Sequence, residues 1–266
     1  MMRALSAEFA KLKRSRMILW TSLVVVGYTS IGLAVFPLLK KAQAGDIAMG
    51  AAGIGDAFAK AGITEMNWAN AMKFIPMGVS GAWGIMLLSL VAAYVFGREL
   101  REGTDIATAT LPIRREYVAV AKMAVIAVWT VYLSALAVIA DVAVVGIYMG
   151  FDTFAWSYVG RAFVETLYAC LPIFLTLPLV GWFAMSRKGY LRPMLFALVT
   201  FMVANTLVGL DAAAYVPWAM PIVGVGVTWM PTRGELGAVS WLIAAAVFIV
   251  GMAVVLRSAN RAELSA

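Results

Sequence analysis

Nine charged residues fall within the 27 positions of FGRELREGTDIATATLPIRREYVAVAK, residues 96–122, between two long apolar runs. Gly103 can end the preceding helix, and Thr104 offers an N-cap oxygen to a new one. Asp105 favours the positive end of that helix dipole, and Pro112 stops the helix within about two turns. The spacing predicts a short surface helix between two long ones. Such a helix suits docking of a partner protein, and a solvated loop without a partner is the alternative.

Two side chains of this segment are our candidates for contact with the partner. Glu99 lies at the end of the preceding apolar run, where the chain turns. Arg115 carries a guanidinium that can hold a partner carboxylate in a two-point contact. We therefore expect Glu99 and Arg115 to transmit force between this segment and a docked protein.

A second group of ionisable residues lies within or next to apolar runs. Asp141 precedes Gly150 by nine residues, Glu165 follows the start of the next run, and Arg161 lies at the same end. Charged groups inside a membrane are costly and indicate function by default. An ion pair of Arg161 with Asp141 or Glu165 would stabilise the outer helix ends. Contact with a cationic or amphipathic substrate is the alternative.

Residue types that are absent narrow the chemistry further. The chain has no histidine, which excludes His-based catalytic triads, His metal ligands and His proton relays. It has no GxxxxGK[ST] phosphate loop, so we do not expect it to hydrolyse nucleotide by itself. We expect no catalytic residue, no metal site and no cofactor on this chain.

The elements that position these residues follow from composition. Hydrophobic residues make up 63% of the 266 positions and charged residues 13%, too little polar surface for a water-soluble protein. About 20 apolar residues suffice to cross the hydrocarbon core as a helix. The sequence predicts an all-α membrane protein, one transmembrane domain over 1–266, with six spans at 17–39, 74–97, 123–150, 162–186, 193–210 and 236–256.

Lysine and arginine set the orientation, because short loops rich in these cations stay cytoplasmic. A cytoplasmic N-terminus places 15 of the 21 cations inside. Both termini and the segment between the second and third spans are then cytoplasmic. The net charge of +7 reflects this topology, and we expect no nucleic-acid partner.

Two further segments border the membrane. Residues 1–16 carry Met2, Leu5, Phe9 and Leu12 at helical spacing among basic residues, which predicts an amphipathic helix with its apolar stripe in the lipid boundary. An ordinary basic flank is the alternative, whereas a cleaved signal peptide is disfavoured because the apolar run that follows is too long.

After the fifth span, residues 215–230 are apolar but short and are interrupted by Pro217 and Pro221. Proline breaks helices, and the tryptophans of this segment favour an interface. We expect an external interfacial or re-entrant helix here. The single cysteine, Cys170, is interpreted as a small apolar core residue.

The order and spacing of residues in the charged segment resemble those of type-2 ABC (ATP-binding cassette) transporter permeases. The family pattern has Glu, three residues, Gly-Thr, three residues, two leucines, two residues, Pro, one residue, Ser or Thr, and Arg. The residues that match it are Glu99, Gly103, Thr104, Pro112 and Arg115. Thr108 and Ala109 replace the leucine pair, and Arg114 replaces the Ser or Thr. The basic leader with Glu8 and Lys11 is similar to the bacitracin-export and lantibiotic-immunity branch.

The resemblance implies a permease subunit of an exporter in the bacterial cytoplasmic membrane. It would work with a second copy or a sister permease and with two ATPase subunits that bind ATP and Mg. Residues 1–16 would be the connecting helix, and about 99–116 the coupling region, including Arg114. The cargo would be an amphipathic compound such as a drug, peptide antibiotic or lipid-like molecule. The alternative class is a stand-alone membrane protein, such as a scaffold or ion-coupled carrier.

Overall fold

The computed structural model describes residues 2–13, 15–43, 66–81, 83–103, 115–185, 190–225 and 235–261. Within these ranges the regular structure is helical and contains no strand. Five described helices are long and apolar enough to cross a membrane: Met17–Leu38, Trp83–Glu102, Arg115–Met149, Trp156–Ala184 and Ala238–Ala259. The all-helical, multi-pass membrane fold expected from composition is confirmed.

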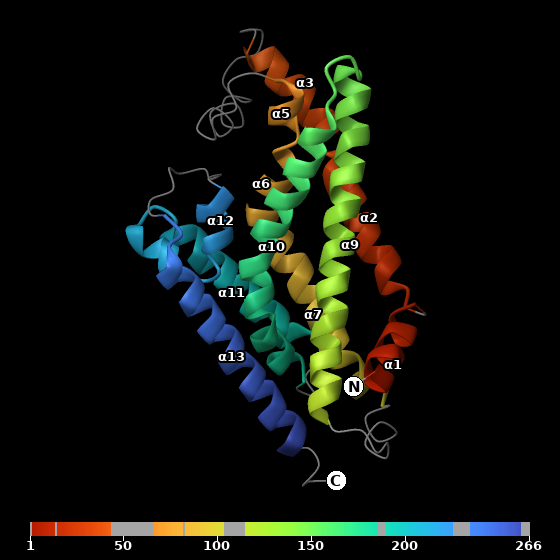
Figure 1. The fold of residues 1–266 in the computed structure, drawn as a ribbon, viewed down its shortest axis with the longest axis vertical. Helices are drawn as coiled ribbons and strands as arrows, with labels where there is room; N and C mark the ends of the chain where they lie inside the picture. The colour runs from red at the N-terminus through yellow and green to blue at the C-terminus, as the bar shows by residue number, and fades with distance from the viewer. Residues whose placement is uncertain are drawn as a thin grey trace.

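Figure 1 shows the long helices running mostly along the long axis, with α1 and the end of α13 near one end and α3 and α5 at the other. In chain order the elements are α1 (Met2–Lys13), α2 (Met17–Ser30), α3 (Gly32–Gln43), α5 (Trp68–Ala71), α6 (Phe74–Gly81), α7 (Trp83–Glu102), α9 (Arg115–Met149), α10 (Trp156–Ala184), α11 (Leu191–Leu207), the 3₁₀ helix η1 (Asp211–Tyr215), α12 (Met220–Val225) and α13 (Ala238–Arg261).

The longest helix, α9, has 35 residues, or about 52 Å at 1.5 Å per residue. The hydrocarbon core of a bilayer is about 30 Å thick, so α9 extends beyond it. A tight turn at Gly150, with φ of 74°, leads into α10. Trp68 of α5 donates its indole N–H to the Gly150 carbonyl at 3.1 Å and packs against Phe151 and Phe154. These aromatic rings hold the ends of α5, α9 and α10 together.

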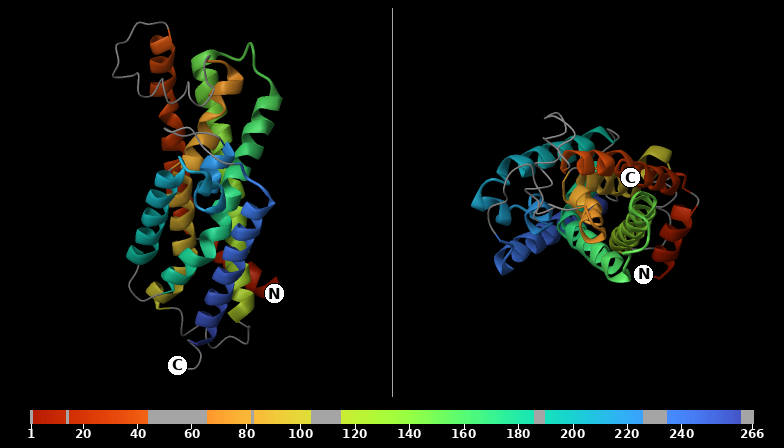
Figure 2. Two further views of the ribbon diagram at one scale, coloured as in Figure 1. Left: turned by 90° about the vertical axis from the view of Figure 1, so that its left-hand side faces the viewer. Right: turned by 90° about the horizontal axis from the view of Figure 1, so that it is seen from above.

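Helix α10 lies among the other helices and packs against α13, α7, α9, α6, α11 and α12. Figure 2 shows the same arrangement from the side and along the long axis. Its contact with α7 is close, because a β-carbon at Gly181 would lie 2.8 Å from the Phe96 ring. Buried side chains such as Trp129 of α9 and Leu177 of α10 fill the interior. α7, α9 and α10 thus form the closely packed centre of the described fold.

Three of the expected spans differ in detail from the sequence prediction. The first divides at Ile31 into α2 and α3, and α3 contains Pro37, which lacks a backbone donor. The second begins as α6 and continues as α7. The fifth is α11, which has 17 residues and is shorter than the five candidate spans. The count of six spans therefore stays a prediction.

The segment after α11 turns back onto the protein. η1 and α12 lie within or next to the stretch expected to be interfacial, and α12 packs against α10 and α6. Ile222 of α12 is fully buried against Ala204 and Val208 of the α11 end. The described part of this segment thus packs mainly on protein. Residues 226–230 of the expected helix lie outside the described residues.

Candidate functional site

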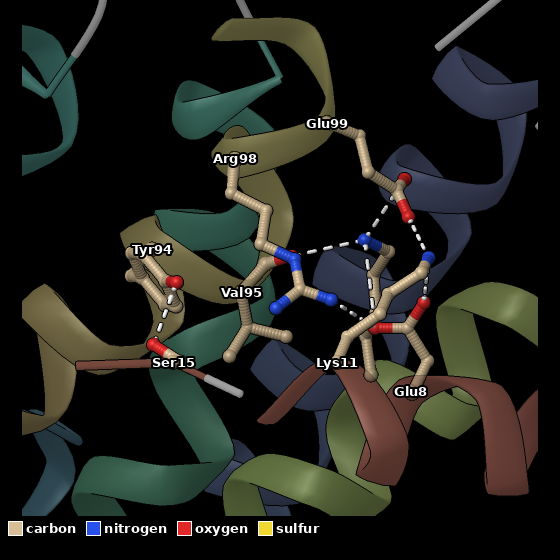
Figure 3. A network of polar contacts seen from close by, with 8 residues as sticks. Glu8, Lys11, Ser15, Tyr94, Val95, Arg98 and Glu99 are labelled. Carbon is tan, nitrogen blue, oxygen red and sulfur yellow. Dashed lines mark hydrogen bonds and ion pairs between the residues drawn. The ribbon is translucent and has the colours of Figure 1, made fainter. Parts of the chain in front are cut away.

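A cluster of five charged side chains lies where α1, α7 and α9 meet, at the end of the bundle that holds both chain ends (Figure 3). We call it the charge cluster; its members are Glu8 and Lys11 from α1, Arg98 and Glu99 from α7, and Lys122 from α9. It contains three cations and two carboxylates. Charged groups this deeply placed are stable only when they are paired.

Glu8 is the most buried acid of the charge cluster, with 3% of its surface exposed. Its Oε1 accepts a hydrogen bond from Lys11 Nζ at 2.7 Å. Its Oε2 lies 3.7 Å from Arg98 Nη2 and 4.0 Å from Lys122 Nζ. One carboxylate of α1 therefore contacts cations from all three helices.

Glu99 supplies the second carboxylate. It accepts a hydrogen bond from Lys11 Nζ at 2.5 Å and lies 3.0 Å from Lys122 Nζ. Lys122 Nζ also donates to the Val95 carbonyl at 2.9 Å. Lys11 and Lys122 are thus each shared by both carboxylates, which ties α1 to the ends of α7 and α9 through charge-assisted hydrogen bonds.

Neighbouring contacts fix the position of α1 further. Phe9 and Leu12 pack against the main hydrophobic core, whereas the sequence predicted that their stripe would enter the lipid boundary. Ser15, just after α1, hydrogen-bonds Tyr94 of α7 through their hydroxyl groups at 2.7 Å. The Arg98 guanidinium carbon lies 5.9 Å from the centre of the Tyr94 ring. In this structure α1 is a packed part of the protein rather than a helix held by lipid alone.

Lys11 lies outside the membrane-spanning helices, and its charge is maintained by the cluster. Burial lowers the pKa of its ammonium, but the hydrogen bonds to Glu8 and Glu99 and their negative charges outweigh this effect. The pKa of Lys11 is therefore raised above its ordinary value. Lys11 remains a cation, and an ion-pair partner, throughout the neutral pH range.

The residues expected to couple to a partner fall into two groups. Glu99, Gly103 and Arg115 are described, whereas Thr104, Pro112 and Arg114 lie outside the described residues. Gly103 ends α7 with a φ of 66°, the left-handed conformation that glycine adopts without strain. Arg115 begins α9 and donates from Nη1 to the Ala259 carbonyl of α13 at 3.2 Å. Glu99 and Arg115 therefore both serve contacts within the chain.

The outer ionisable residues do not form one cluster. Arg161 Nε donates to Glu165 Oε1 at 2.7 Å, one turn away on α10. Asp141 is fully buried in α9, and neither of its carboxylate oxygens has a hydrogen-bond partner among the described residues. Of the two partners expected for Arg161, the structure pairs it with Glu165. Asp141, the other partner considered for Arg161, is not paired with it in this structure.

Sequence reasoning missed most of the charge cluster. Glu8 was considered only as part of the basic leader, and Lys122 only as the last residue of the charged segment. A signal was present, because Lys122 stands in an apolar stretch and Glu8 has a basic residue at i+3. The pairing itself depends on how α1 folds back against α7 and α9, which is a long-range property.

The sequence also matches a known protein family. The model of a family described as ABC-2 family transporter protein matches residues 4–204, about three quarters of the chain. This chain belongs to the ABC-2 transporter family. The match begins in α1 and ends within α11, so it includes every member of the charge cluster. No curated protein and no solved structure matches the chain.

Membership of the ABC-2 family makes the chain the membrane permease of an ABC transporter, a subunit without its own ATPase domain. Such a permease works with ATPase partner subunits. Among the described residues, no group of three or more Asp, Glu, Cys or His side chains could hold a metal ion. The charge cluster of this ABC-2 chain joins three helices through ion pairs and can transmit motion between them.

Proposed function

We propose that the chain is the permease subunit of an ATP-driven exporter that moves an amphipathic compound across the bacterial cytoplasmic membrane. It acts as a dimer, with a second copy or a sister permease, and with two ATPase subunits that bind ATP and Mg. Its kinship with the bacitracin-export and lantibiotic-immunity branch is inferred from the resemblance of the basic leader around Glu8 and Lys11, and its cargo class is inferred from the family resemblance. Family membership supports the permease role, and the remaining features are our inference.

The proposed topology has six spans with both termini in the cytoplasm. α11 supplies the fifth span: its 17 residues extend about 26 Å at 1.5 Å per residue, close to the hydrocarbon thickness. An even number of spans agrees with α1 and the end of α13 lying at the same end of the bundle (Figure 1). The positive-inside rule assigns that end to the cytoplasm.

We propose that motion of the ATPase reaches this chain through the coupling segment, residues 104–114. The observation that supports this is that the charge cluster joins the helices at both ends of that segment. Residues 104–114 connect α7 to α9. Glu99 of α7 and Lys122 of α9 lie 3.0 Å apart, close to where α7 ends and α9 begins. A force on the segment therefore reaches two long helices that are already joined by an ion pair. Lys11 and Glu8 extend the same connection to α1.

Individual residues take distinct roles in this proposal. Glu99 positions α1 and α9 rather than touching the ATPase directly. Gly103 sets the direction in which the chain leaves α7. Thr104, Pro112 and Arg114 shape and present the coupling helix, and Arg114 is the strongest candidate for a carboxylate of the ATPase. Arg115 anchors the start of α9 to α13, so motion of the segment also reaches the C-terminal helix.

The outer ionisable residues differ in how accessible they are to a substrate. The Arg161–Glu165 pair is accessible, with 68% of the Arg161 side chain exposed. It could meet cargo at the outer end of the bundle. Asp141 is closed off in this conformation and would need a rearrangement to do so. We assign cargo contact to the Arg161–Glu165 pair before Asp141.

Co-purification of the chain with an ABC ATPase from its native membranes tests this function. The parent protein should retain that ATPase through affinity purification in mild detergent. Arg114→Ala should weaken ATPase binding about tenfold or more, because interface arginines often contribute more than 1 kcal/mol. The matched control is Arg161→Ala, an exposed arginine at the opposite end, which should bind the ATPase like the parent.

Absence of any nucleotide-binding ATPase from the purified parent protein would overturn the permease proposal. Equal binding by the Arg114→Ala variant and the parent would leave the permease role standing and overturn the role of Arg114. Membrane insertion of each variant is checked in the same preparations, since no residue changed here lies within the hydrocarbon-spanning part of its helix.

A further inference from the structure

Asp141 is an unusual buried group in this chain. It lies in α9 with none of its surface exposed. Both carboxylate oxygens are buried and have no hydrogen-bond partner among the described residues. An ionised carboxylate in such a place would have lost its hydration without receiving hydrogen bonds or a counter-charge in return.

The helices around Asp141 offer no cation to it. α2 packs against α9 and contains Tyr28 as its one ionisable residue. α5 and α6 contain no ionisable residue, and Lys73 between them donates no hydrogen bond to Asp141. α10 places Arg161 with Glu165 instead. The lysines of α3 are in its last turn, at positions 40 and 41.

The charged residues of the remaining neighbours lie far along the bundle. Those of α1, α7 and α13 are near the other end of α9, where Lys122 contributes to the charge cluster. Nineteen residues separate Lys122 from Asp141, about 28 Å along a helix. No described cation is therefore placed to neutralise Asp141 across a hydrogen-bond distance.

The ring of Tyr28 is held in place by neighbouring aromatic rings. Tyr28 packs against Phe74 and Trp83, with ring centroids 5.3 and 4.9 Å away. Phe36 of α3 packs against Phe74 in turn. A proton is the one cation that needs no room of its own. It converts the carboxylate into a neutral acid that an apolar surrounding tolerates.

We infer that Asp141 is a proton-binding site that is occupied when α2 and α3 are packed against α9. Separation of α2 and α3 from α9 would admit water, and the hydrated carboxyl would then release its proton. The closed packing and the bound proton favour each other by linkage. Opening of this part of the bundle is thus coupled to proton release, independently of whether an ATPase drives the opening.

Infrared spectroscopy of the purified chain in lipid nanodiscs tests this site without an ATPase or a known cargo. The parent protein should show the carbonyl-stretch band of a protonated carboxylic acid at neutral pH. Labelling with ¹³C-aspartate should shift the band, which assigns it to an aspartate without relying on any variant. Asp141→Asn should remove the band. Glu165→Gln, which changes an accessible and paired acid, should keep it.

A stability measurement supplies the second readout. A group that binds its proton in the folded state and loses it on unfolding makes stability fall as pH rises. Above the ordinary titration range of aspartate, the unfolding equilibrium constant of the parent should rise by up to about tenfold per pH unit relative to the Asp141→Asn variant. Absence of an acid band at neutral pH in the parent, or a band that survives Asp141→Asn, would overturn the inference. So would equal pH slopes for the two proteins.

Discussion

Replacing Glu8 with glutamine should detach α1 from the bundle more often than any other single conservative change in that helix. The substitution keeps the size and helix propensity of the side chain and removes its charge. The charge cluster would then hold three cations and one carboxylate. Arg98 and Lys122, whose side chains are only 8% and 6% exposed, would share Glu99 with Lys11.

The expected cost is set by how deeply each partner is buried. Loss of one member of a buried ion pair costs about 3–5 kcal/mol. The Lys11 side chain is 34% exposed, so water compensates part of its loss. The Glu8 contacts with Arg98 and Lys122, at 3.7 and 4.0 Å, are long. We therefore expect the low end, about 3 kcal/mol, which corresponds to about a hundredfold change in an equilibrium constant.

Hydrogen exchange of the α1 amides measures this cost directly, because it reports the local opening equilibrium. Exchange across residues 4–13 should accelerate by about a hundredfold in Glu8→Gln. Glu165→Gln is the matched control, since it removes one charge from a solvent-accessible pair, and it should change stability by less than about 0.5 kcal/mol.

A second substitution separates charge balance from packing. Arg98→Met in the Glu8→Gln background leaves two cations and one carboxylate, which restores the net charge of the parent cluster. The double variant should exchange more slowly in α1 than Glu8→Gln alone, by a coupling of about 0.5–3 kcal/mol. The reasoning is refuted if α1 exchanges at the parental rate in Glu8→Gln, or if the control accelerates it equally.

Three further predictions concern the backbone, the core and the topology. Gly103→Ala meets no neighbouring atom within 4 Å, yet its φ of 66° should cost about 1 kcal/mol, visible as a lower thermal midpoint; an unchanged midpoint would contradict the turn described at α7. Gly181→Ala places a methyl group 2.8 Å from Phe96 and should destabilise by about 1–3 kcal/mol, with partial recovery on adding Phe96→Leu; no recovery would exclude this clash as the cause. Single cysteines at Asp152 and Ser258, in a cysteine-free background, should divide by side: an impermeant thiol reagent should label Asp152→Cys in intact cells and not Ser258→Cys, and the reverse pattern would invert the topology.

Sequence alone could predict the long helices because their apolar length is a local property. The runs at 123–150 and 162–186 correspond to α9 and α10, although α9 begins earlier, at Arg115. Its first two turns are too polar to belong to an apolar run. The turn at Ile31, which separates α2 from α3, was not predicted.

The candidate site was predictable in part. Glu99 and Gly103 were selected from the spacing of the charged segment, and Gly103 does turn the chain. The partner of Glu99 inside the chain could not be read from spacing, because Lys11 lies 88 residues away. Asp141 was recognised as costly, but its lack of any described counter-ion depends on which faces of α2, α6 and α10 meet α9.

The central claim is that ATP hydrolysis on a partner subunit moves helices of this chain. The most direct measurement is hydrogen exchange of the purified complex with its ATPase, in nanodiscs, with and without ATP. We predict that ATP changes protection at the start of α9, residues 115–122, and in α1, because the charge cluster joins both to the coupling segment. Identical exchange of this chain in the two conditions, with the ATPase bound and hydrolysing ATP, would contradict the account.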